Sequence, residues 1–163
     1  MNKNKTISIR DAFGKALADE GKKNKKIVAV SIDLKGACKL SYFFESFPER
    51  SFEVGIAEAN AVGVATGLSF EGFRPFVASF GSFITGKSAE IRNSISYNKA
   101  PVVIVGTHCG LIGSDGATQS ALQDLSIMRS MPFFNVFQPC TPLDTYEIIK
   151  YVCKSKEPTY LRI

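Results

Sequence analysis

The 163-residue chain contains no tryptophan, one histidine and four cysteines. No two cysteines form a Cys-x-x-Cys pair, so we expect neither a disulfide framework nor a metal site made of cysteine and histidine. No stretch approaches the roughly 20 consecutive apolar residues of a membrane span. The polar first ten residues also lack the apolar segment of a secretory signal. These absences favour a cytoplasmic protein with reduced thiols that does not act at a membrane.

The net charge of the chain is +5, and this charge is unevenly placed. Much of the excess comes from two groups of lysines that we expect to be solvated: Lys3 and Lys5, then Lys22, Lys23, Lys25 and Lys26. The 13 phenylalanines lie mainly in apolar runs and do not alternate with these lysines, which argues against nucleic-acid binding. A mildly basic surface instead suits an anionic cofactor and phosphorylated sugars.

Patterns typical of helices and of short buried strands alternate along the chain. Six strands are expected, over residues 27–31, 51–54, 76–79, 102–105, 134–137 and 159–163. Helices are expected before and between them, over residues 8–20, 40–47, 58–70, 82–97, 121–130 and 142–154. Ser8 and Thr141 are suited to begin the first and last helices, and Gly21 to end the first. The pattern predicts an α/β fold: a doubly wound, mostly parallel six-stranded sheet with helices on both faces, forming one domain over residues 1–163.

One acidic residue occupies a place where chemistry is expected. Glu58 lies in the first turn of the predicted helix 58–70, directly after the predicted strand 51–54 and a turn at Gly55. Open α/β sheets bind ligands at the carboxyl ends of their strands. A carboxyl group desolvated there has a raised pKa and can hold or deliver a proton near neutral pH. The alternative is that Glu58 only complements the dipole of its helix.

The segment over residues 54–83 reads VGIAEANAVGVATGLSFEGFRPFVASFGSF. It resembles the signature of the transketolase family, in the pyrimidine-binding domain, and the resemblance extends over nearly the entire chain. It implies the thiamine-diphosphate-binding fold. In the family, the glutamate equivalent to Glu58 contacts the N1′ nitrogen of the cofactor's aminopyrimidine. The resemblance therefore implies that Glu58 binds the cofactor and acts in catalysis as a proton relay.

The resemblance also implies cofactor-binding roles for three further residues. Asp33 matches an aspartate near the thiazolium side of the cofactor, although an acid that starts a turn is an equally good explanation. Phe80 and Phe83 match aromatic positions of the family. We expect Phe80 to stack on the aminopyrimidine and Phe83 to pack beside it. The alternative is that both belong to the core, as most phenylalanines do.

Four residues match positions that the family uses for substrate. Arg10 matches an arginine that binds substrate phosphate, with a surface ion pair as the alternative. His108 matches a histidine that helps to bind phosphate and is a catalytic candidate, although a lone histidine is more often structural. Asp115 matches the aspartate that recognises the C2 hydroxyl. Gln119 replaces a family histidine that takes part in proton handling, and glutamine forms hydrogen bonds but does not titrate.

The family's GDG…N motif, which anchors the diphosphate through Mg²⁺, is absent from this chain. The resemblance thus implies that a partner, a diphosphate-binding transketolase subunit, binds Mg²⁺ and shares the thiamine diphosphate. The chain is similar to the start of the C-terminal subunit of split transketolases, and we expect a C-terminal domain to be missing after Ile163. Because the glycine- and alanine-rich helix suits close contact, we also expect a homodimer of this domain.

The resemblance predicts a subunit of a transferase that moves a two-carbon ketol unit between sugar phosphates. We expect the domain to be inactive by itself, because half of the cofactor site is missing. A related enzyme class is the first alternative: a 1-deoxyxylulose-5-phosphate synthase or the beta subunit of a 2-oxo-acid dehydrogenase. A non-catalytic assembly subunit is the second, and Gln119 keeps it open.

Overall fold

The computed structural model describes residues 7–112 and 114–163, so the predicted solvation of Lys3 and Lys5 falls outside the described residues. A six-stranded sheet forms its centre, in the order β2-β1-β3-β4-β6-β5. The strands are β1 (Ile27–Ser31), β2 (Ser51–Glu53), β3 (Arg74–Phe80), β4 (Val103–Thr107), β5 (Asn135–Phe137) and β6 (Thr159–Arg162). All neighbouring strands are parallel, which confirms the predicted doubly wound sheet.

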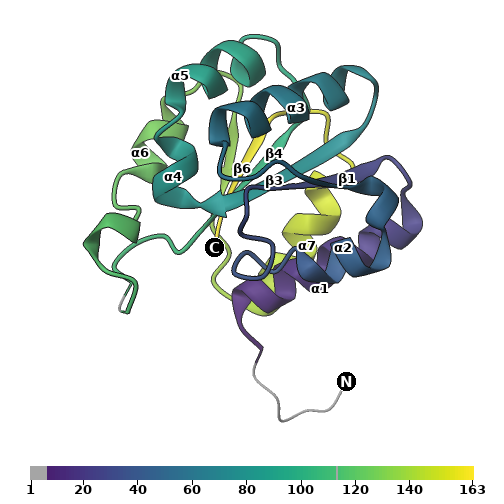
Figure 1. Cartoon of the computed structure of the whole chain (residues 1–163), viewed down its shortest axis with the longest axis horizontal. Helices are drawn as coiled ribbons and strands as arrows, with labels where there is room; N and C mark the ends of the chain where they lie inside the picture. The colour runs from purple at the N-terminus through teal and green to yellow at the C-terminus, as the bar shows by residue number, and fades with distance from the viewer. Residues whose placement is uncertain (1–6, 113) are drawn as a thin grey trace.

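Helices cover both faces of the sheet (Figure 1). One face is covered by α1 (Ile9–Lys23), α2 (Ser41–Ser46) and α7 (Pro142–Val152). The other is covered by α3 (Glu58–Phe70), α4 (Gly81–Thr85), α5 (Ser88–Glu90), the π-helical segment η2 (Ile91–Ser96) and α6 (Asp124–Arg129). Two short 3₁₀ segments are η1 (Pro48–Arg50) and η3 (Ala117–Gln119). Across residues 7–112 and 114–163, the helices fall short of the length and apolarity that a bilayer crossing demands.

Two layers of buried apolar side chains hold the helices to the sheet. The layer under α1, α2 and α7 includes Phe13, Leu17, Phe43, Phe76, Ile149 and Leu161. The layer under α3 and α6 includes Val30, Ala65, Val77, Ile95, Ile104 and Tyr160. Successive strand residues point to opposite faces, so Phe76 enters one layer and Val77 the other. Burial of each large side chain contributes about 1.5–3 kcal/mol to stability.

The helix starts follow local sequence signals. Ser8 precedes α1, and its hydroxyl oxygen accepts a hydrogen bond from the N–H of Asp11 at 3.0 Å. Thr141 precedes α7 and forms a capping box with Asp144, with hydrogen bonds of 3.1 and 2.8 Å. Helix α3 covers the predicted residues 58–70. These caps satisfy backbone N–H groups that no helical carbonyl can reach.

The prediction that Gly21 ends the first helix is wrong. Helix α1 continues to Lys23, and Gly21 is buried within it. A Cβ atom at Gly21 would lie 2.6 Å from the ring of Phe43 and 2.7 Å from the ring of Phe47. Glycine is therefore required here for the close approach of α2, rather than for a turn.

The predicted helices 82–97 and 121–130 are only partly correct. Gly86 and Lys87 separate α4 from α5, and the following turns are π-helical. The hydroxyl of Thr85 donates to the carbonyl of Gly81 at 2.6 Å, a contact that tends to bend helices. Helix α6 starts later than predicted, at Asp124. Glycine in the helix interior and side-chain competition for carbonyls account for the break between α4 and α5.

The four cysteines are free and differ in exposure. Cys38 and Cys153 are buried and Cys109 is half-buried, whereas Cys140, in the turn between β5 and α7, is exposed. Burial raises the pKa of the Cys38 thiol to about 11. It raises the pKa of Cys109 and Cys153 to about 12. These three thiols therefore stay protonated at neutral pH.

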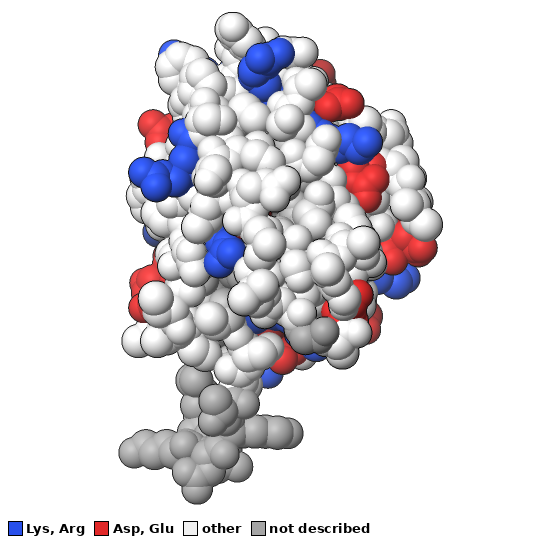
Figure 2. Space-filling view, turned by 90° about the vertical axis from the view of Figure 1, so that its left-hand side faces the viewer, with Lys and Arg blue, Asp and Glu red and all other residues white. Residues whose placement is uncertain are grey.

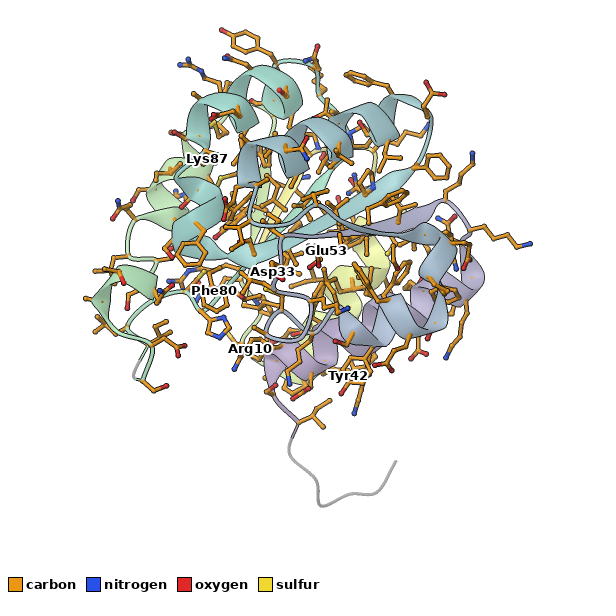
Figure 3. The ribbon with its side chains drawn as sticks, viewed as in Figure 1. Arg10, Asp33, Tyr42, Glu53, Phe80 and Lys87 are labelled. Carbon is orange, nitrogen blue, oxygen red and sulfur yellow. The ribbon has the colours of Figure 1, made fainter. Side chains whose placement is uncertain are left out.

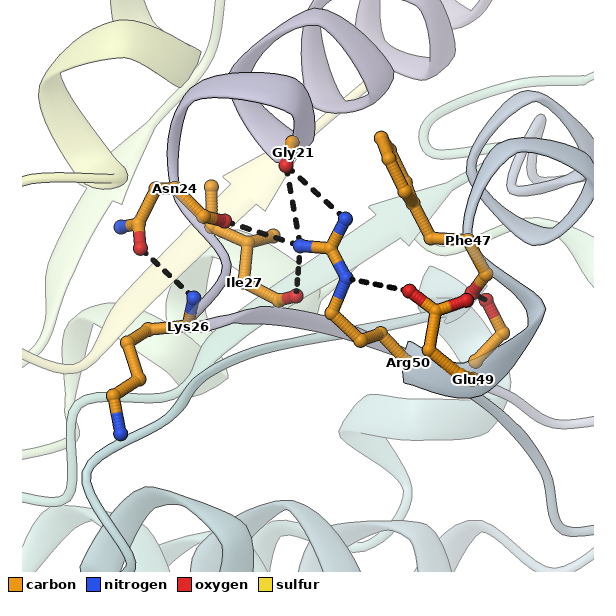
Figure 4. A network of polar contacts seen from close by, with 8 residues as sticks. Gly21, Asn24, Lys26, Ile27, Phe47, Glu49 and Arg50 are labelled. Atoms are coloured by element: carbon orange, nitrogen blue, oxygen red, sulfur yellow. Dashed lines mark hydrogen bonds and ion pairs between the residues drawn. The ribbon is translucent and has the colours of Figure 1, made fainter.

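Arg50 links the C-terminal end of α1 to the start of β1 through hydrogen bonds (Figure 4). Its guanidinium donates hydrogen bonds to the carbonyl oxygens of Gly21, Asn24 and Ile27 at 3.1–3.3 Å. It also lies 3.9 Å from the ring centroid of Phe47. The last carbonyls of a helix lack partners within the helix. One guanidinium satisfies them and stacks on an aromatic ring at the same time.

The variant Arg50→Lys should lower the free energy of unfolding by about 1.5–3 kcal/mol, because an ammonium group cannot reproduce the planar fork. Urea denaturation measures this change. The control is Arg92→Lys at an exposed position, where we expect a change below about 0.5 kcal/mol. Equal losses in both variants would contradict the role of Arg50.

Candidate functional site

The carboxyl ends of β1, β3 and β4 meet at one edge of the sheet. The chain runs from β1 to its neighbour β2 and then returns past β1 to β3, so the strand order reverses between β1 and β3. Open α/β sheets bind ligands at such a reversal. Asp33 follows β1, Phe80 ends β3 and His108 follows β4. Figure 3 shows that Arg10, Asp33, Glu53 and Phe80 come from different elements and project around this edge.

Arg10 and His108 are joined directly. Nη1 of Arg10 lies 2.7 Å from Nε2 of His108, and Nδ1 of His108 lies 2.9 Å from Oγ1 of Thr107. Because arginine can only donate, Nε2 accepts and the ring proton of the neutral imidazole is on Nδ1. Nδ1 then donates to Thr107, whose hydroxyl donates to the carbonyl of Ser79 at 3.3 Å. The connected hydrogen bonds fix both the tautomer and the orientation of His108.

The environment of His108 keeps its side chain neutral. Partial burial lowers the pKa of His108, and the charge of Arg10 lowers it further, with opposition from Asp115. The backbone of His108 has a φ of 55°, a conformation uncommon for residues with a side chain. His108 therefore presents a fixed, uncharged imidazole beside a permanent cation.

Phe80, Phe83 and His108 form a stack of rings at the edge of the sheet. The ring centroid of Phe80 lies 3.8 Å from that of His108 and 5.4 Å from that of Phe83. All three side chains are half-buried. Phe80 also packs against the core layer under α1. The ring of Phe80 contacts the core and also reaches the edge of the sheet. A place in the core and a role in cofactor binding are therefore compatible for this residue.

Glu53, the last residue of β2, was missed by sequence reasoning. Its Oε1 accepts hydrogen bonds from the N–H of Asp33 at 2.7 Å and of Gly55 at 3.2 Å. Partial burial acts to raise the pKa of Glu53, but these N–H donors, together with Ser31 and the charge of Lys35, outweigh it, and the pKa lies below its usual value. Asp33 is exposed and has a φ of 58°. Glu53 therefore holds the turn that carries Asp33 against the turn that leads into α3 and Glu58.

Glu58 is the first residue of α3 and is half-buried. Among the hydrogen bonds and ion pairs of residues 7–112 and 114–163, none involves its carboxylate. No side chain caps the N-terminus of α3 at Ala57. The position is thus compatible with a carboxylate that meets a ligand and with one that complements the helix dipole.

The loop after β4 carries the two remaining predicted residues. Asp115 is exposed and acts on His108 through its charge. Gln119 is half-buried, and its main-chain carbonyl oxygen accepts a hydrogen bond from the Ser82 hydroxyl at 3.0 Å. Its side-chain Oε1 is buried without a hydrogen-bond partner in the described part of the chain. Arg10, His108 and the aromatic stack are thus brought together, whereas Gln119 is fixed against α4.

Asp124 is a second residue that sequence reasoning missed. It is 1% exposed, and its Oδ2 accepts hydrogen bonds from the hydroxyl of Tyr160 and from Nε of Arg162, both at 2.9 Å. Arg162 also lies beside Gly110, at the start of the loop. This buried ion pair anchors the base of the loop to the end of β6. Asp124 and Arg162 are 38 positions apart, so no local spacing pattern predicts their contact.

The side of the molecule formed by α4, α6 and the loop after β4 carries few charged side chains (Figure 2). Three large apolar residues in the loops at the carboxyl edge are strongly exposed: Ile56 (81%), Leu111 (91%) and Leu122 (63%). Large apolar side chains exposed in the loops at this edge suit coverage by another protein surface. Within the described ranges, no three His, Cys, Asp or Glu side chains are grouped to hold a metal ion.

Comparison with known proteins identifies relatives of this chain. Residues 5–163 match the family described as the transketolase pyrimidine-binding domain. A Methanocaldococcus jannaschii protein named for the C-terminal section of transketolase is 38% identical over 95% of this chain and 50% of its own length. A subunit of the apulose-4-phosphate transketolase of Phocaeicola vulgatus is 33% identical over 98% of this chain and 52% of its own length. The chain thus spans about half the length of these two relatives.

Solved structures show the same fold. A split-gene transketolase, described as an inactive beta4 tetramer, is 43% identical, with a TM-score of 0.85 over 97% of this chain and 51% of that one. Transketolase from Campylobacter jejuni is 24% identical, with a TM-score of 0.86 over 97% of this chain and 26% of that one. At that identity the second likeness concerns the fold alone.

The first prediction from this geometry concerns the single histidine. The variant Arg10→Met should raise the pKa of His108, because it removes a neighbouring cation. NMR titration of the ring proton signals measures the pKa of His108.

In the unchanged chain the pKa of His108 should lie below 6.5. Stability from the neutral ring is therefore fully present above pH 6.5 and is lost as pH falls through the folded-state pKa.

The control for this titration is Arg92→Met, which removes a positive charge at an exposed site. We expect the pKa of His108 to stay unchanged in that variant. An unchanged or lowered pKa in Arg10→Met would overturn the contact between Arg10 and His108.

A second prediction concerns Glu53. In Glu53→Gln the amide protons of Asp33 and Gly55 should shift upfield, because a neutral amide oxygen accepts more weakly than a carboxylate. In the unchanged chain both signals should titrate together, with a midpoint below 4.5. Amide proton spectra across a pH series measure this. Glu45→Gln, at an exposed acid, should leave both signals and their titration as they are, and independent titration of the two amides would disprove the shared acceptor.

Proposed function

Because the chain belongs to the transketolase family, as a pyrimidine-binding domain, we propose that it forms part of a transketolase-type transferase. It binds thiamine diphosphate together with a diphosphate-binding subunit, and the assembled enzyme moves a two-carbon ketol unit between sugar phosphates. The observation that carries the proposal is the carboxylate of Glu58. It is half-buried, begins the helix that connects β2 to β3 at the carboxyl edge, and has no partner within the described residues.

Four side chains at this edge fit the aminopyrimidine and thiazolium parts of the cofactor. Glu58 offers a carboxyl group that can share a proton with a ring nitrogen. Phe80 and its neighbour Phe83 offer aromatic rings at the edge of the sheet, and Asp33 offers an exposed negative charge toward a cationic ring. When bound, thiamine diphosphate supplies the nucleophilic carbon that allows a bond next to a carbonyl group to be broken.

The substrate end of the proposed site contains Arg10 and His108. In the described structure the guanidinium of Arg10 uses Nη1 for its bonds to Ala37 and His108. Nε and Nη2 remain to bind an oxyanion, a geometry that suits phosphate. Asp115, exposed on the neighbouring loop, can accept a hydrogen bond from a sugar hydroxyl. His108, held neutral by burial and by Arg10, can exchange a proton at Nε2 only after Arg10 releases that atom.

We assign Mg²⁺ and the diphosphate to a partner subunit. The exposed side chains of Ile56, Leu111 and Leu122 support a large protein contact at the carboxyl edge. The exposed face of α3 includes Gly63 and Gly67, where an added Cβ would meet no atom within 4 Å, and this face supports close packing of a second copy of the domain.

A second candidate activity is favoured by one set of relatives. Named 1-deoxy-D-xylulose-5-phosphate synthases are 32–37% identical over 82–99% of this chain and 21–25% of their own length. Gln119, which replaces the histidine of the transketolase pattern, also keeps a non-catalytic role open. The activity test therefore compares a ketose phosphate with a 2-oxo acid as the donor substrate.

In a complex with a diphosphate-binding transketolase subunit, Glu58→Gln should slow hydrogen–deuterium exchange at C2 of the cofactor by at least about 10²-fold. Glutamine keeps the hydrogen-bonding shape but cannot relay a proton. If Glu58 only complements the helix dipole, the variant should instead cost about 0.3–1 kcal/mol of stability with unchanged exchange. NMR exchange rates and the melting temperature, measured on one preparation, separate these outcomes.

Glu71→Gln is the matched control, because Glu71 is an exposed acid at the other end of the same helix. It should change neither exchange nor turnover. Turnover of a ketose phosphate would support ketol transfer, and carbon dioxide release from a 2-oxo acid would select the second activity. A complex that binds the cofactor but turns over neither donor would favour a non-catalytic role.

A further inference from the structure

A hollow of about 450 Å³ lies at the amino end of the sheet, opposite the edge that carries Arg10 and His108. It is formed where β1 and β3 begin and where the chain enters β4 and β6. Its lining includes Lys26, Phe73, Arg74 and the segment 153–156. None of these residues belongs to the proposed cofactor or substrate site.

Arg74 is the unusual member of this group. It is 5% exposed, and in the described structure it pairs with no carboxylate. Its Nε donates to the carbonyl of Val152 at 2.8 Å and its Nη1 to the carbonyl of Glu157 at 3.1 Å. Nη2 is buried and has no hydrogen-bond partner among the described residues. Burial lowers the pKa of Arg74 to about 10, so the guanidinium keeps its charge at neutral pH.

Further donors surround this buried cation. Lys26, Lys154 and Lys156 are exposed around the hollow. The ammonium of Lys26 lies 4.9 Å from the ring of Phe73, which also lines the hollow. The side-chain oxygen of Ser155 accepts the N–H of Glu157, which leaves its hydroxyl proton to donate.

The carboxylates near the hollow are already engaged. Glu20, whose charge helps to raise the pKa of Cys153, forms an ion pair with Lys23 at 2.6 Å. The lining contains four basic side chains and no aspartate or glutamate. The thiol of Cys153 is held protonated by burial, which raises its pKa to about 12. The carboxylate of the nearby Glu157 is engaged by the amide of Asn135 at 2.5 Å. A buried guanidinium with an unused donor is costly unless an acceptor approaches it.

We propose that this hollow binds a phosphate-class oxyanion. The lysine ammonium groups and the Ser155 hydroxyl contact the oxyanion, and the buried guanidinium of Arg74 supplies a fixed positive charge. Phosphate suits the site because a tetrahedral dianion accepts from several donors at once. The volume also leaves room for a small organic group on the phosphate. The bound anion would link β1, β3 and the entry to β6.

The proposal is tested with inorganic phosphate and, separately, ribose 5-phosphate, added to the full chain at low ionic strength. Calorimetry should show saturable binding with a dissociation constant of about 1 mM or tighter, equivalent to about −4 kcal/mol. Amide spectra should shift at Arg74, Ser155 and Lys156. Tighter binding of the sugar phosphate would identify a phosphorylated metabolite as the ligand, and equal affinities would identify free phosphate.

The double variant Lys154→Ala/Lys156→Ala should weaken binding about tenfold or more, because it removes two charged contacts. Lys15→Ala/Lys87→Ala is the charge-matched control, since neither residue lines the hollow, and it should bind as the unchanged chain does. Melting temperatures verify that both variants are folded. Three results would each overturn the proposal: no saturable binding, equal weakening in both double variants, or shifts confined to Arg10 and His108. The last result would leave the substrate site of the proposed transferase supported.

Discussion

The contact between Arg10 and His108 is the constraint on which the candidate site depends. It joins the first turn of α1 to the residue that follows β4, and it ends in the backbone of β3 through Thr107 and Ser79. Because a guanidinium can only donate, Nε2 of His108 must be the acceptor in this contact. The contact therefore sets the tautomer, the neutral state and the ring plane of His108. The ring of Phe80 then stacks on a surface whose orientation is already fixed.

Local signals predicted much of the fold but little of this contact. Helix α3 begins at Glu58 as expected, because the preceding strand and turn are encoded within a few residues. Arg10 and His108 are 98 positions apart, so their meeting depends on the order of the strands and on no spacing pattern. Family resemblance supplied both residues as candidates but not their direct bond. At Gly21 a local signal was misleading. Glycine is typical of helix ends, but here it allows close packing inside a helix.

The two ends of the sheet handle polar groups differently. At the amino end, Arg50 binds three backbone carbonyls between α1 and β1, and Arg74 binds two between α7 and β6, which consolidates the framework. Nη2 of Arg74 has no partner among the described residues. At the carboxyl end, Asp33 and His108 take left-handed backbone conformations, and Glu58 is left without a partner among the described residues. Strained and unpartnered groups persist only where the surrounding structure is rigid. The framework that the two arginines consolidate therefore supports the left-handed backbone of Asp33 and His108 at the other end of the sheet.

The unequal burial of the cysteines has a practical consequence for spectroscopy. Thiol reagents attack the thiolate, and the three shielded sulfurs have pKa values of about 11 to 12. The sulfur at Cys140 is exposed, in the turn that follows β5. A maleimide dye would thus mark one position in an otherwise unmodified protein. Because that turn lies at the carboxyl end of a strand, the dye would report on protein docking at this edge through changes in its emission.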